Sequence, residues 1–134
     1  MGLALYPLQA DTTTTTCTIY HIRSPDDQTF IFDPRVQPLE DPVRRVRCEI
    51  ALLTAEQYTR TIEILLQYGN DKGDIPEMEI GNCQDWVASA VSTLEQEGLV
   101  QKGEREFWRW MVNQSAEGMK GTCVETGRGW FMGR

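Results

Sequence analysis

Hydrophobic and polar residues alternate with a period of two in four segments of the first half of the chain, as is typical of half-buried β-strands. The alternation predicts strands at residues 3–7, 17–23, 28–33 and 46–53. In the second strand, one side carries Cys17, Ile19 and His21, and the other carries Thr18, Tyr20 and Ile22. We expect the first three strands to form an antiparallel meander. The threonine-rich stretch 11–16 would be its hairpin loop, and the proline-punctuated stretch 34–42 would be a surface loop.

In the second half of the chain the apolar residues recur at intervals of three and four, which predicts three helices. The first begins at Thr54, which forms a capping box with Gln57, and runs to about residue 68. The second begins after Asn82, a favoured N-cap residue, and ends before Gly98. The third is expected at residues 102–117.

Together these elements predict an α+β fold, in which an antiparallel four-stranded sheet packs against the helix after Asn82 and two further helices complete the structure. We expect residues 1–117 to form a single domain. Residues 118–134 contain five glycines and are expected to form an irregular C-terminal tail.

Charge and composition narrow the classes of partner. The net charge is −7, so a nucleic acid or an anionic membrane surface is a poor partner. No apolar run approaches the roughly 20 residues of a transmembrane helix, and no signal-peptide pattern is present. We therefore expect a soluble, cytoplasmic protein with four reduced cysteines. A single histidine, scattered acids and the absence of a Cys-x-x-Cys pair or a phosphate-binding glycine motif predict neither a metal site nor a cofactor.

The candidate chemistry lies at Cys83, in the first turn of the second helix. A thiol there lies near the positive end of the helix dipole and near unpaired backbone N–H groups, which favour the nucleophilic thiolate. The same N–H groups could stabilise an oxyanion that forms on a substrate carbonyl. Asp85 opposes the thiolate, because it places a carboxylate two residues away. The structural alternative is that Cys83, like most unpaired cysteines, is simply a small buried hydrophobic residue.

A nucleophilic cysteine needs a general base, and His21 is the only histidine in the chain. An isolated histidine on a strand is more often a core or surface residue than a base. Its importance rises here because no other imidazole is available to Cys83.

These residues resemble a known family. Leu-Ala-Leu-Tyr at residues 3–6, Tyr-His at 20–21 and Asn-Cys opening a helix at 82–83 are similar to the permuted papain-like domains of the NlpC/P60 superfamily, in its lecithin-retinol-acyltransferase-like branch. That family has a histidine-bearing sheet followed by an Asn-Cys-Glu-His-Phe-Val helix, which Asn-Cys-Gln-Asp-Trp-Val at residues 82–87 resembles. The segment looks still more similar to small, uncharacterised fungal proteins with an Asn-Cys-x-x-Trp-Val signature. The resemblance covers about residues 2–100.

The resemblance implies that Cys83 is the nucleophile and that His21 occupies the position of an orienting residue. The family's usual base stands at the start of the first strand, and that position here is Gly2. Either the chain begins too late to include the base, or His21 acts as the base, or this member is not catalytic. Gln84 and Asp85 replace the Glu-His pair that follows the cysteine in the family, so the orienting or oxyanion role of Asn82, Gln84 and Asp85 is open.

Two functions from different classes therefore follow. The first is a thiol-dependent hydrolase or acyl or amide transferase, acting on the carbonyl of a small molecule or lipid through Cys83 and His21. The second is a catalytically silent scaffold that binds a small ligand or a protein, for example as an accessory protein of a fungal biosynthetic pathway. A third interpretation, an interaction module that uses Trp108 and Trp110, has less support. The substrate and the oligomeric state stay open.

Overall fold

A computed structural model describes residues 1–7, 16–39, 46–128 and 130–132. Its main sheet has three antiparallel strands in the order β1-β2-β5, with β1 at Leu3–Leu5, β2 at Thr16–Tyr20 and β5 at Arg35–Pro38. Leu3 pairs with Tyr20 and Cys17 with Gln37, so β2 is the central strand. Two smaller antiparallel pairs accompany this sheet. They are β3 (Ile22–Arg23) with β4 (Ile31–Phe32), and β6 (Val46–Cys48) with β7 (Trp130–Met132).

The α+β class is confirmed, but the single four-stranded sheet is wrong. The expected third strand pairs with β3 in a separate ribbon, and residues 35–38, expected to be a loop, provide the third strand of the main sheet instead. Pro38 is tolerated because β5 is an edge strand, where a missing N–H breaks no ladder. The expected strand at 46–53 shortens to β6 and pairs with the end of the chain. Most of the expected 11–16 loop and of the proline-rich stretch after residue 39 lies outside the described residues.

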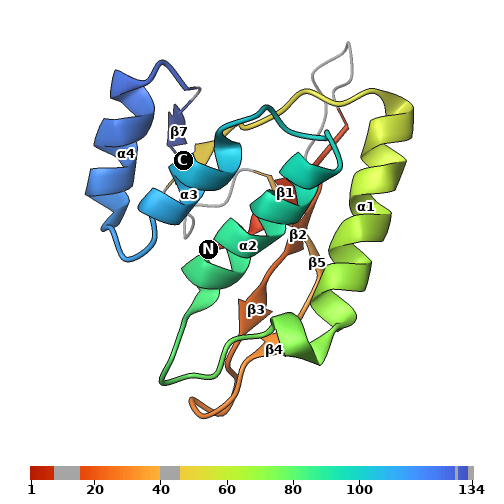
Figure 1. The fold of residues 1–134 in the computed structure, drawn as a ribbon, viewed down its shortest axis with the longest axis vertical. Coiled ribbons are helices and arrows are strands. Elements are labelled where there is room, and N and C mark those ends of the chain that lie inside the picture. The colour runs from red at the N-terminus through yellow and green to blue at the C-terminus, as the bar shows by residue number, and fades with distance from the viewer. Residues whose placement is uncertain (8–15, 40–45, 129, 133–134) are drawn as a thin grey trace.

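Two long helices lie side by side across one face of the main sheet (Figure 1). Helix α1 spans Ala55–Asn70 and begins with the expected capping box between Thr54 and Gln57. A short 3₁₀ turn, η1 at Lys72–Asp74, follows it. Helix α2 spans Cys83–Gln96, and Asn82 is its N-cap, as expected.

The helix expected at 102–117 is in fact two helices, α3 at Glu104–Trp110 and α4 at Ala116–Glu125. The break falls at Asn113, whose φ of +70° is left-handed, a conformation that asparagine tolerates better than most residues. Ser115 then caps a new helix by accepting a hydrogen bond from Gly118 N. The prediction of an irregular tail is therefore wrong for 118–125 and 130–132, because α4 and β7 occupy them. Cys123 of α4 is fully buried in the common core.

The core forms where α2 meets the sheet. Trp86 is 1% exposed, and its ring centroid lies 5.7 Å from that of Phe32 and 5.5 Å from that of Tyr68. Val87, Ala90, Val91 and Leu94 continue the same buried face of α2, at the helical spacing that the sequence shows.

No helix in the described ranges combines the length and apolar character needed to cross a membrane.

Truncation of Trp86 tests this view of the core. Trp86→Ala is expected to lower the free energy of unfolding by about 3 kcal/mol or more, because it removes a buried indole and leaves a cavity. Urea denaturation followed by circular dichroism measures the change. The matched control is Trp110→Ala, since Trp110 is 66% exposed and its loss should change stability by less than about 0.5 kcal/mol. Equal losses in the two variants would contradict the assignment of Trp86 as the centre of the core.

Candidate functional site

Cys83 is the first residue of α2, at a helix end held by reciprocal hydrogen bonds. The Asn82 side-chain oxygen accepts from Gln84 N at 2.8 Å and from Asp85 N at 3.3 Å. In return, the Asp85 carboxylate accepts from Asn82 N at 2.8 Å. Cys83 packs against the edge of the core and is half-buried.

The three polar residues around Cys83 are all used to hold the helix in place. Asn82 donates to the Asn113 side chain at 3.0 Å, and Gln84 both accepts from Asn113 N at 2.5 Å and donates to the Gln114 carbonyl. Asp85 lies 3.7 Å from an Arg109 guanidinium nitrogen. These bonds anchor the start of α2 to α3 and to the turn between α3 and α4. They explain Asn82, Gln84 and Asp85 without any contact to a substrate.

The cap also limits what the helix end offers to an oxyanion. The N–H groups of Gln84 and Asp85 are taken up by Asn82. Of the first-turn donors, this leaves the N–H of Cys83 itself, which has no acceptor within the helix.

His21 lies between β2 and β3, next to an acidic side chain that sequence analysis did not single out. Its Nε2 is 3.9 Å from an Asp33 carboxylate oxygen, and Asp33 is in turn paired with Arg23 and Arg35. The backbone also joins the two residues, since Asp33 N donates to the His21 carbonyl at 3.0 Å. Asp33 could have been noticed from the sequence only as the acid at the end of the predicted 28–33 strand.

The Nε2 of His21 is buried and has no hydrogen-bond partner among the described residues, as is also the case for Thr61 Oγ1, Trp86 Nε1 and Arg128 Nε. Burial lowers the pKa of His21 below its ordinary value of 6.5, and the nearby N-terminal amine, Arg35 and Arg23 lower it further. Asp33 acts in the opposite direction but does not outweigh them. The ring is therefore mainly neutral at pH 7, the form that can accept a proton.

Cys83 and His21 each lie close to one of the first two residues of the chain. The Met1 nitrogen is 3.8 Å from the Cys83 sulfur. A Cβ built on Gly2 would lie 2.9 Å from the His21 Cβ and 2.8 Å from Ile19 Cγ1. Nε2 makes no hydrogen bond to the sulfur, so the two groups share a neighbourhood but do not form a hydrogen-bonded pair through that atom.

The space around Gly2 decides whether a side chain could stand there, as the sequence-based resemblance would lead one to expect of a general base. Contacts of 2.8 and 2.9 Å are shorter than real Cβ atoms show, so Ile19 and His21 fill the space that a side chain at Gly2 would need. A base at this position would require the sheet edge to rearrange.

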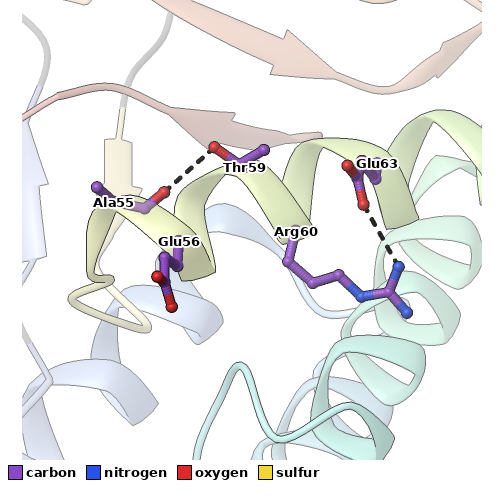
Figure 2. Close-up of a pocket in the computed structure, with 5 residues that line it drawn as sticks. All are labelled: Ala55, Glu56, Thr59, Arg60 and Glu63. Atoms are coloured by element: carbon purple, nitrogen blue, oxygen red, sulfur yellow. Dashed lines mark hydrogen bonds and ion pairs between the residues drawn. The ribbon is translucent and has the colours of Figure 1, made fainter.

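Two surface hollows are described, and neither contains Cys83 or His21. One, of about 400 Å³, is lined by Ala55, Glu56, Thr59, Arg60 and Glu63. All five residues belong to α1, and Figure 2 shows two internal contacts among them, the Thr59–Ala55 hydrogen bond and the Arg60–Glu63 ion pair. The other, of about 1070 Å³, lies between α2 and α3.

Within the described ranges, no group of three or more histidine, cysteine or acidic residues could hold a metal ion.

No protein-family model, curated protein or solved structure matches this chain.

The burial of His21 predicts that the pKa of its imidazole is lowered in the folded protein. Nuclear magnetic resonance of the single imidazole should give a pKa below 6.5 in the folded protein. Because the unfolded chain then binds more protons, the contribution of His21 to stability is present above pH 6.5 and is lost as the pH falls below it. His21→Gln, which does not titrate, is the control and should lack this component. A folded-state pKa above 6.5 would contradict the described burial.

A second prediction separates the capping role of Asn82 from a role in catalysis. Asn82→Ala should lower the free energy of unfolding by about 1 to 2 kcal/mol, because two first-turn N–H groups lose their acceptor. Asn82→Asp, which retains the acceptor, should keep most of that stability. Thermal unfolding of both variants measures the difference, and an Ala variant as stable as the parent would show that the cap contributes nothing.

Proposed function

We propose that this protein is a thiol-dependent hydrolase or acyl or amide transferase in which Cys83 is the nucleophile and His21 manages the proton. The observation that carries the proposal is the unpartnered, buried Nε2 of a neutral imidazole close to the residues that contact a half-exposed thiol. Four buried side-chain atoms lack a partner among the described residues, and the imidazole nitrogen of His21 is the one of them that can take a proton from a thiol.

The proposed reaction has two steps, acylation of Cys83 and then deacylation. His21 takes the thiol proton, and the thiolate adds to the carbonyl carbon while the Cys83 N–H donates to the oxyanion. The leaving alcohol or amine takes the proton back from His21, and a thioester to Cys83 remains. Water or an acceptor amine or alcohol then attacks the thioester and regenerates the thiol.

The alternative is a catalytically silent scaffold that binds a ligand or a protein. Two observations favour it: the packed space around Gly2, and the use of Asn82, Gln84 and Asp85 to anchor α2. In this alternative, Cys83 is a helix-start residue at the edge of the core, and His21 is a partly buried sheet residue held near Asp33.

Alkylation by iodoacetamide distinguishes the two functions. In the thiol enzyme, Cys83 should react at pH 7 roughly tenfold faster than glutathione, and His21→Ala should remove the difference. Mass spectrometry of the peptides identifies the labelled residue.

The other thiols give little background in this experiment. Cys17 and Cys123 are buried, at 4% and 0% exposure. Burial and a hydrogen bond with Cys123 raise the pKa of Cys48 to about 12, so it is protonated at neutral pH. Cys83→Ser is the control and should abolish the fast phase. Labelling of Cys83 at the glutathione rate would favour the silent scaffold.

A further inference from the structure

Two thiols meet where the last helix and strand join the rest of the fold, and neither belongs to the site around Cys83. Cys48 lies on β6 and Cys123 on α4, and a hydrogen bond links their side chains. Both are free thiols in the structure. Cys123 belongs to the hydrophobic core, and Cys48 packs against the same cluster.

The backbone brings these two residues together independently of the thiols. Helix α4 ends in a Schellman motif, in which Gly127 has a φ of +72° and Arg128 N donates to the Cys123 carbonyl at 2.9 Å. The motif turns the chain back toward β7, which lies beside α4 (Figure 1). On β7, Trp130 is the pairing partner of Cys48. A short connection therefore joins Cys123 to the residue opposite Cys48.

The two cysteines differ in access to solvent. Cys123 is 0% exposed, whereas Cys48 is only partly buried. Cys48 is therefore the residue that a dissolved oxidant meets first. Cys123 can react only with a sulfur that already lies beside it, so the pair consists of a first-reacting thiol and a resolving thiol.

The surroundings of the pair slow its oxidation and protect the product. Burial and the hydrogen bond with Cys123 raise the pKa of Cys48 to about 12, while nearby Arg128 opposes the shift and Glu104 adds to it. Glu104 and Arg128 are themselves an ion pair at 2.6 Å, so the guanidinium charge is largely balanced. Because the thiolate is the reacting form, Cys48 reacts slowly at neutral pH. The same burial hinders reduction, since a reducing thiol must reach a sulfur at the core.

From the contact between these two thiols we infer that Cys48 and Cys123 form an oxidation site, which a low-molecular-weight disulfide converts into a Cys48–Cys123 disulfide. The Cys48 thiolate attacks one sulfur of the reagent to give a mixed disulfide, and one small thiol leaves. Cys123 then loses its proton and attacks the Cys48 sulfur, and a second small thiol leaves. The protein loses two hydrogen atoms, which the reagent gains as two thiols.

The disulfide has a structural consequence for the second half of the chain. It ties β6 to α4 and closes a loop of roughly 75 residues. A cross-link of this length restricts the unfolded chain and so stabilises the folded one. The inference rests on neither of the functions proposed for Cys83.

Oxidised glutathione, added to the full chain at pH 9, tests the inference. Mass spectrometry should show a loss of about two hydrogen atoms, and peptide mapping should place the link between Cys48 and Cys123. The oxidised protein should melt roughly 5 to 10 °C above the reduced protein. Cys48→Ser and Cys123→Ser are the matched controls, and neither should form the link. Glutathione attached to Cys83 increases the mass, so it cannot be mistaken for the link.

Three outcomes of this experiment would overturn the inference. They are a link between other cysteines, a glutathione adduct on Cys48 that Cys123 does not displace, and four cysteines that stay unlinked.

The pH dependence of the oxidation rate identifies the thiol that reacts first. Between pH 8 and pH 10 the rate should rise roughly a hundredfold, because Cys48 stays far below its pKa of about 12 and its thiolate fraction grows tenfold with each pH unit. For a free thiol with a pKa of about 8.5, the rise over the same range is only about fourfold. A rate that levels off by pH 9 would show that Cys48 does not react first and would also overturn the inference.

Discussion

The packing of one side of α2 against the main sheet is the contact on which the rest of the structure depends. Trp86 at the start of the helix and Leu94 near its end are both buried, and Tyr20 of β2 and Leu65 of α1 meet them in the same cluster. Each such side chain removes apolar surface from water, which is the main favourable term in folding. Because the helix is buried along its length, its first residue has a fixed place relative to the sheet. Cys83 owes its position to this packing.

Hydrogen bonds at the start of α2 extend the same constraint to the second half of the chain. Asn82 and Gln84 bind the turn between α3 and α4, and Asp85 meets Arg109. A second ionic contact holds the far side, where buried Glu104 accepts from Trp108 and pairs with Arg128 at 2.6 Å. Arg128 also lies 3.7 Å above the ring of Phe107. The residues after 100 are thus part of the same folded unit, although the family resemblance does not cover them.

The region around His21 combines a buried imidazole with a nearby carboxylate and with the start of the chain. Burial keeps the imidazole neutral, and Asp33 stands close enough to orient it, both of which suit a base. The N-terminal amine lies 3.8 Å from the Cys83 sulfur, and the next residue, Gly2, packs against Ile19 and the Cβ of His21.

The sequence alone determined the features that depend on neighbouring residues. The capping box at Thr54 and the N-cap at Asn82 are local interactions. The buried side of α2 follows from apolar residues spaced three and four apart. The sequence predicted these three features correctly. Only the tertiary structure decided which strands pair, because partners such as β6 and β7 lie far apart in the sequence and carry no local signal of each other. It likewise broke the third helix at Asn113, where the side chain is bound by Asn82, and turned Trp110 outward while burying Trp108. Contacts between separate elements place Asp33 beside His21 and Arg109 beside Ser89 and Asp85, so the surroundings of Cys83 and His21, unlike these two residues themselves, could be known only from the fold.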